Sequence, residues 1–137
     1  MIDGGLCSLF QRYLRDWHWQ RIETGGTGNG IPDINGCSDG IEVWIEAKVC
    51  TGWKPTVRSE QVGWLERRFR AGGRVFLAVR QRGSTRDTLW LLSPLAARRL
   101  IMGDRLNELD PKIYVLGCWE NGPGAWDWAK VDTLLRA

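Results

Sequence analysis

The chain has 137 residues, 43% of them hydrophobic and 26% charged, with a formal net charge of +3, which is typical of one globular domain and argues against two. Its longest apolar run, residues 75–79, is too short for a membrane-spanning helix, which needs about 18 apolar residues, and the N-terminus lacks a signal-peptide pattern. The four cysteines have no CxxC or Cys/His spacing, which argues against zinc and disulfides. Together with the short apolar run, this predicts a soluble, cytoplasmic protein with no membrane partner.

The N-terminal half of the chain predicts one helix and three strands. Apolar residues recur at spacings of three and four in the helix, whereas the strands alternate between apolar and polar residues. A run of glycines after the first strand indicates a loop, and the Asp39-Gly40 pair indicates a tight turn between the other two strands. The predicted ranges are 6–17 for the helix, 25–30 for the loop, and 19–24, 31–37 and 41–49 for the strands.

The C-terminal half predicts three more helices and three more strands. Ser59 is a candidate N-cap for the first helix, and Ser93 is one for the second. The first strand, residues 74–80, is a nearly continuous apolar run, as expected of a central strand buried on both faces. The predicted ranges are 59–70, 93–101 and 128–136 for the helices and 74–80, 88–92 and 113–120 for the strands. This order predicts a single α/β domain with one mixed β-sheet flanked by helices.

Two carboxylates and a lysine are predicted to converge at the hairpin. Side chains alternate along a strand, so Glu46 and Lys48 share one face and Ala47 points to the other, which we expect to be core. A two-residue turn at 39–40 sets a register in which Asp33 pairs with Glu46. The alternative interpretation is a surface Glu/Lys pair beside an aspartate in a turn.

Asp33 and Glu46 would be two hard oxygen ligands with open positions around them, an arrangement that suits Mg²⁺. The backbone carbonyl of Ala47 and the carboxylate of Glu23 are candidates for further ligands. The Lys48 ammonium could lower the pKa of a bound water or stabilise the charge that develops on phosphorus. The constellation therefore predicts a phosphodiester hydrolase.

Positive charge is concentrated in the middle of the chain. Residues 54–105 contain twelve Lys or Arg and four Asp or Glu, whereas the flanking segments are both net negative. Fifteen of the nineteen basic residues are Arg, which binds phosphate through two N–H groups, so we expect a polyanionic partner. Arg58, Arg80 and Arg82 flank the predicted site and are the expected phosphate contacts. A solvated helix face is the alternative interpretation.

The order of these motifs resembles a known nuclease superfamily, the PD-(D/E)xK nucleases, and most closely the small stand-alone VRR-NUC proteins of phages and bacteria. The matching pieces are Gly30-Ile31-Pro32-Asp33, the hairpin, Glu46-Ala47-Lys48, Ser59-x-Gln61 at the start of a helix, and the apolar strand after it. The resemblance implies a restriction-endonuclease-like fold, Mg²⁺ or Mn²⁺ dependence and DNA cleavage. It also implies that Asp33 and Glu46 hold metal, that Lys48 serves the attacking water, and that Gln61 orients water or phosphate.

Stand-alone members of this family are similar to Holliday junction resolvases, which act as homodimers. The resemblance therefore implies a structure-selective endonuclease for branched DNA in a bacterial or phage-infected cell. The glycine run at 25–30 lacks the Gly-Lys-Ser/Thr end of a phosphate cradle, and we expect it to form a loop that contacts DNA. The resemblance covers residues 6–82, and we expect residues 83–137 to be peripheral, with their tryptophans forming either a dimer interface or core. Alternative functions are a catalytically silent nucleic-acid-binding module, a flap or nicking nuclease, and a nuclease subunit whose target is chosen by another protein.

Overall fold

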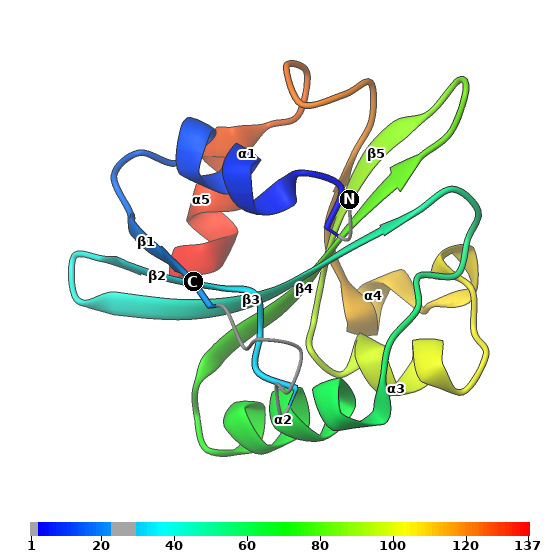
Figure 1. The fold of residues 1–137 in the computed structure, drawn as a ribbon, viewed down its shortest axis with the longest axis horizontal. Coiled ribbons are helices and arrows are strands. Elements are labelled where there is room, and N and C mark those ends of the chain that lie inside the picture. Colours follow the sequence, from blue (N-terminus) through cyan, green and yellow to red (C-terminus); the bar gives the residue numbers. More distant parts are fainter. Residues whose placement is uncertain (1–2, 23–29) are drawn as a thin grey trace.

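A mixed β-sheet with helices on both faces forms the described part of the chain, which is residues 3–22 and 30–137 of the computed structural model (Figure 1). Its strands are β1 (His18–Arg21), β2 (Ile34–Ser38), β3 (Ile41–Cys50), β4 (Arg74–Arg82), β5 (Asp87–Leu92) and β6 (Val115–Trp119). The helices are α1 (Leu6–Tyr13), α2 (Ser59–Arg70), α3 (Ala96–Ile101), the short 3₁₀ helix η1 (Leu106–Glu108), α4 (Pro111–Tyr114) and α5 (Trp128–Arg136).

The strands follow one another across the sheet in chain order, from β1 to β6. Each neighbouring pair is antiparallel except β3 and β4, which are parallel and are connected through α2. The predicted α/β class and mixed sheet are confirmed, and the long elements follow the predicted order, with η1 and α4 added before β6. No helix within residues 3–22 and 30–137 is long and apolar enough to cross a membrane.

Two hydrophobic cores lie on opposite faces of the sheet. Helices α1 and α5 cover one face of the sheet, and helices α2 and α3 cover the other (Figure 1). Phe10 and Ile45 are fully buried under α1 and α5. Leu65 is fully buried under α2 and α3.

The prediction that the Ala47 face of β3 is core is confirmed, since Val43, Ile45 and Ala47 are buried there. The opposite face, predicted to be surface, is covered as well, because Trp44 on that face packs against the α2 core. Glu46, on the α2 side of β3, is therefore enclosed rather than on an open surface.

The helix predicted over residues 6–17 is too long by four residues, since α1 ends at Tyr13. Leu14 leaves the helix with a ψ of 66°, and Trp17 donates its Nε1–H to Asp132 of α5 at 2.7 Å. Both Leu14 and Trp17 are buried in the core between α1 and α5. Their helical spacing therefore reflects a common core and not a common helix.

Two boundaries near the C-terminus also differ from the prediction. The helix predicted from Ser93 begins at Ala96, because the intervening residues form a turn in which the Ala96 N–H donates to the Ser93 carbonyl. The strand predicted over 113–120 begins at Val115, because Asp110 caps the short helix α4 just before it.

All nine tryptophans of the chain contact one of the two cores. The α1 and α5 side holds Trp17, Trp19, Trp119, Trp126 and Trp128, and the α2 and α3 side holds Trp44, Trp53, Trp64 and Trp90. None of them is among the exposed large apolar side chains of the described residues. Core packing, the alternative interpretation from the sequence, accounts for the tryptophans.

Candidate active site

The hairpin between β2 and β3 brings the predicted residues together. Asp39 and Gly40 have φ values of +52° and +77°, as a two-residue hairpin turn requires. The confirmed register places Asp33 just beyond the end of β2, opposite Glu46. The N–H of Ala47 donates a hydrogen bond of 2.8 Å to Oδ2 of Asp33, which holds this carboxylate against β3.

Gly30, the first residue of the Gly-Ile-Pro-Asp motif, has a structural role. Its φ of +79° favours glycine, and an added Cβ would collide with the Glu60 carbonyl and approach the Gln61 nitrogen to 2.7 Å. The backbone of Gly30 therefore packs directly on the first turn of α2. This contact fixes the segment that leads to Asp33 relative to Gln61.

Gln61 connects the start of α2 to two of the predicted site residues. Its Oε1 accepts hydrogen bonds from the backbone N–H of Arg58 at 3.0 Å and from Lys48 Nζ at 2.8 Å, and its Nε2 donates to Glu46 Oε2 at 3.1 Å. These partners fix the orientation of the amide, because the oxygen faces donors and the nitrogen faces a carboxylate. The prediction of Ser59 as N-cap is wrong: Arg58 occupies that position, and Gln61 accepts its N–H.

Glu46 is a buried carboxylate with an unsatisfied oxygen. Its side chain is 2% exposed, Oε2 lies 3.5 Å from Lys48 Nζ, and Oε1 has no hydrogen-bond partner among the described residues. Burial and the negative charge of Asp33 raise the pKa of Glu46 to about 8, and Lys48 offsets this only in part. A cation beside Glu46 would pair the free oxygen and relieve the repulsion between the two carboxylates.

The residues present fit a hard divalent cation with oxygen ligands. Asp33 and Glu46 supply carboxylates, and the carbonyl of Ala47 points to the Asp33 side of β3, because its N–H donates to Asp33 and both groups of a strand residue face the same side. The described residues contain no cluster of three or more His, Cys, Asp or Glu side chains suited to a metal. Glu23 and residues 25–29 of the predicted loop lie outside the described residues.

In the metal-free protein, Glu46 is expected to make the free energy of unfolding fall as the pH rises. Its folded pKa of about 8 exceeds the ordinary 4.5, so the folded protein holds a proton that the unfolded chain releases. The stabilisation is fully present below pH 4.5 and is lost as the pH passes through 8. The slope is at most about 1.4 kcal/mol per pH unit.

Urea unfolding of EDTA-treated protein at several pH values between 4.5 and 8 measures this slope. The Glu46→Gln variant stays neutral throughout and is expected to show a flatter dependence. The same slope in both proteins would contradict the assignment of the proton to Glu46.

The three predicted phosphate contacts have different surroundings. Arg58 is exposed beside the site and lies 3.6 Å from Glu60. Arg80 is 7% exposed and is not available to a phosphate, because it donates two hydrogen bonds to Asp87, at 2.8 and 2.7 Å, and one to the Gly4 carbonyl at 2.6 Å. The register with β3 places Arg80 and Arg82 on the sheet face opposite Glu46. We therefore remove Arg80 from the candidate interface, and exposed Arg82 does not flank the site.

Arg80→Ala is expected to destabilise the fold by about 3 kcal/mol, because it leaves Asp87 and a buried carbonyl without their partner. Arg82→Ala, an exposed change on the same strand, is expected to stay within about 0.5 kcal/mol of the unchanged protein. Chemical denaturation of the two variants tests this contrast. Equal losses of stability would contradict a structural role specific to Arg80.

The four acidic residues of the basic segment, residues 54–105, all form ion pairs with arginines of the same segment. The four pairs are Arg58–Glu60, Arg98–Glu66, Arg80–Asp87 and Arg99–Asp104. Within the described residues, the basic residues of the segment that have no ion-pair partner are Lys54, Arg67, Arg68, Arg70, Arg74, Arg82, Arg86 and Arg105. The surplus positive charge therefore rests on these residues, which the sequence did not single out except for Arg82.

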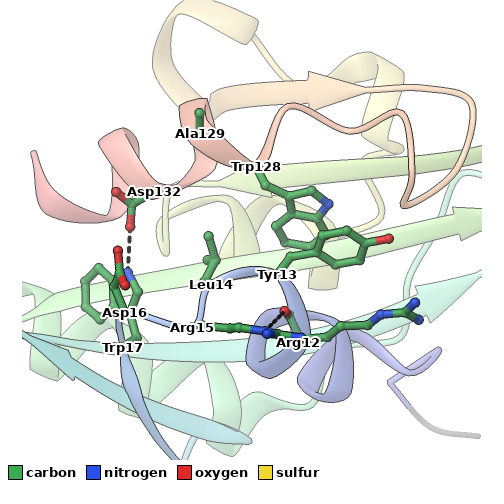
Figure 2. Close-up of a pocket in the computed structure, with 9 residues that line it drawn as sticks. All are labelled: Arg12, Tyr13, Leu14, Arg15, Asp16, Trp17, Trp128, Ala129 and Asp132. Carbon is green, nitrogen blue, oxygen red and sulfur yellow. Dashed lines mark hydrogen bonds between the residues drawn. The ribbon is translucent and has the colours of Figure 1, made fainter.

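A hollow of about 550 Å³ lies on the opposite side of the sheet, between the end of α1 and α5 (Figure 2). Tyr13 and Trp128 stack there, as Figure 2 shows, and their ring centres are 4.7 Å apart. Its two arginines are balanced by two aspartates, one of which, Asp132, is already bound to Trp17. The hollow contains none of the predicted catalytic residues.

A comparison with known protein families and with curated proteins found no match for this chain. The geometry of the site is therefore the basis for a functional assignment. Sequence reasoning missed the contact of Gly30 with α2 and the capping role of Gln61. A Gln at the third position of a predicted helix was the available signal for the latter.

Proposed function

We propose that the protein is a metal-dependent endodeoxyribonuclease with a restriction-endonuclease-like fold, which hydrolyses phosphodiester bonds in branched DNA. The observation that carries the proposal is the buried Glu46 carboxylate, with one oxygen unpartnered, beside Asp33 and Lys48. A surface Glu/Lys pair, the alternative interpretation from the sequence, would leave Glu46 exposed to water, whereas its side chain is 2% exposed. A simple ion pair would also lower the pKa of the carboxylate rather than raise it.

In this proposal, Asp33, Glu46 and the Ala47 carbonyl hold Mg²⁺, and Mn²⁺ can replace it. When bound, the ion supplies positive charge that polarises the scissile phosphate and the attacking water. Lys48 adds a second positive charge at a defined position, because Gln61 Oε1 and Glu46 hold its Nζ. The enclosure of these groups strengthens their electrostatic effect on the phosphate relative to the same groups in water.

Incubation with a panel of labelled DNAs tests the proposal. The panel contains a four-way junction, a flap, a nicked duplex, a linear duplex and a single strand, each with Mg²⁺, Mn²⁺ or EDTA. We expect cleavage of the junction with either metal and none with EDTA. Cleavage of the flap or nicked duplex instead would identify a flap or nicking nuclease, and binding without cleavage of any DNA would favour the catalytically silent module.

A homodimer is part of the proposal, because resolving a four-way junction needs two cuts related by near-twofold symmetry. Since the tryptophans are packed against the cores, other apolar side chains must form the contact. The candidates are the exposed large apolar side chains of α2, α3, α4 and the neighbouring loops and strand. They are Phe69, Leu95, Ile101, Met102, Ile113 and Leu116. Light scattering at micromolar concentration is expected to give twice the chain mass. A monomer that makes paired cuts in one encounter would contradict the dimer.

A further inference from the structure

A polar pocket of about 320 Å³ lies on the α2 side of the sheet, where β3 and β4 begin and α2 ends. Trp44, Arg68 and Arg74 are among its lining residues, and we call it the Trp44 pocket. Alternation along β3 places Trp44 on the same face as Glu46. The Trp44 pocket and the candidate active site therefore lie at opposite ends of α2, with Gln61 at the active-site end.

Two buried N–H donors of the pocket residues have no acceptor. Trp44 Nε1 and Arg74 Nε are shielded from solvent, and no atom of the described chain accepts a hydrogen bond from either. By contrast, five other indoles donate to an acceptor within the protein, those of Trp17, Trp19, Trp90, Trp126 and Trp128. Because buried donors are rarely left unpaired, two of them on residues that line one pocket point to an acceptor that the described chain does not supply.

The charges at the pocket favour an anion. The guanidinium of Arg68 lies 5.4 Å from the centre of the Trp44 ring and 4.7 Å from that of Trp64. Its stem passes over Gly73, where an added Cβ would approach Arg68 Cδ to 2.5 Å. Neither Arg68 nor Arg74 has an ion-pair partner among residues 3–22 and 30–137. Glu42, on the pocket rim, is exposed. Within the described chain, the pocket is therefore lined by two guanidinium groups without ion-pair partners and by an indole N–H without an acceptor, which are donor types that bind oxyanions.

We propose that the Trp44 pocket binds a phosphate group, and that this phosphate belongs to the DNA backbone on one side of the cut. The assignment to DNA rests on the proposed function, whereas phosphate binding does not. The twelve residues of α2 span about 18 Å, at about 1.5 Å per residue. Phosphates of one strand of B-DNA advance about 3.4 Å per base pair, so a strand that runs along α2 would place the bound phosphate about five base pairs from the active site.

The indole N–H resonance of Trp44 in ¹⁵N-labelled, EDTA-treated protein tests phosphate binding directly. The resonance is assigned by its loss in Trp44→Phe, and inorganic phosphate and a DNA duplex are then titrated separately. We expect it to shift with both, while the resonances of the five indoles with internal acceptors stay in place. Chloride at matched ionic strength is expected to leave Trp44 unchanged. A Trp44 resonance that does not move, or that moves equally with chloride, overturns the proposal that the Trp44 pocket binds phosphate.

Arg74→Gln is expected to weaken phosphate binding about tenfold, because it removes a charged donor from the oxyanion. The five internally bonded indoles show in the same spectra whether the variant is folded. If Arg74→Gln is unfolded, Arg68→Gln replaces it with the same expected loss. Unchanged phosphate affinity in a folded variant overturns the assignment of these arginines to the pocket.

DNA binding in EDTA separates the two sources of phosphate. Arg74→Gln is expected to weaken duplex affinity about tenfold and to reduce the log–log salt slope by about 0.9, whereas Arg12→Gln, on the opposite side of the sheet, changes neither. Lost phosphate binding with unchanged DNA affinity overturns DNA as the source of the phosphate. Failure of the unchanged protein to cleave any DNA overturns the proposed function, and a specific Trp44 shift in that protein still supports the pocket.

Discussion

Asp33→Asn and Glu46→Gln are each expected to abolish DNA cleavage, a loss of more than about 10³-fold, while DNA binding is kept or improved. Each substitution removes one of the two carboxylates that fit a divalent cation. Asp33→Asn also removes a negative charge that repels the phosphate, whereas Glu46, with a pKa of about 8, already holds its proton in the metal-free protein at neutral pH, so Glu46→Gln is expected to keep DNA binding unchanged. Single-turnover cleavage with Mg²⁺ measures the first effect, and gel-shift binding in EDTA measures the second. Unchanged turnover in either variant would contradict the assignment of the active site.

The control for these variants is Glu120→Gln, an exposed carboxylate at the end of β6, far in the chain from the hairpin. It is expected to cleave as the unchanged protein does. Loss of folding is not expected to explain the inactivity of Glu46→Gln, because the neutral amide removes the cost of a buried, repelled carboxylate. Retained or increased stability at pH 8 together with lost cleavage would separate chemistry from structure in this variant.

The hairpin and the convergence of Asp33 with Glu46 could be predicted from the sequence for a definite physical reason. A two-residue Asp39-Gly40 turn admits one pairing register, and alternation then decides which side chains share a face. Local chain geometry is sufficient for both inferences. The same holds for β4, where a continuous apolar run reports burial on two faces.

The environment of Arg80 could not be predicted in this way. Its partner Asp87 belongs to the next strand, and Gly4 belongs to a distant segment, so the ion pair depends on how β5 and the N-terminus pack. An arginine at the end of an apolar strand has the same sequence pattern whether it faces solvent or is buried with a carboxylate. The face that it occupies relative to Glu46 follows only from the parallel register of β3 and β4.

The burial of Glu46 was likewise outside the reach of local patterns. Alternation placed Glu46 opposite the Ala47 face, and the covering of that face by α2 depends on the crossover between β3 and β4. Gln61 reaches Glu46 only because α2 begins where Gly30 permits close backbone contact. The site residues were therefore predictable as a set, whereas the enclosure that gives them unusual chemistry required the tertiary structure.

Lys48→Met is expected to lower the rate of cleavage by about 10²-fold or more, because it removes the ammonium and keeps most of the apolar stem. Metal binding should persist, since Lys48 is not an oxygen ligand. Single-turnover rates at saturating Mn²⁺, together with the loss of the free-ion signal as Mn²⁺ binds, measure the two quantities separately. Lys130→Met, an exposed lysine on α5, is the matched control and is expected to keep full activity.

Gln61→Leu distinguishes the charge of Lys48 from its placement. This variant keeps the ammonium and removes the amide that holds it, and it also leaves the Arg58 N–H without its capping acceptor. Gln61→Leu is expected to lower both the cleavage rate and, by about 1 kcal/mol, the free energy of unfolding, whereas Lys48→Met lowers mainly the cleavage rate. Full activity in Lys48→Met would refute the role of the lysine but would not contradict the assignment of Asp33 and Glu46 as metal ligands. Full activity in Gln61→Leu would show that the lysine acts without being held by Gln61.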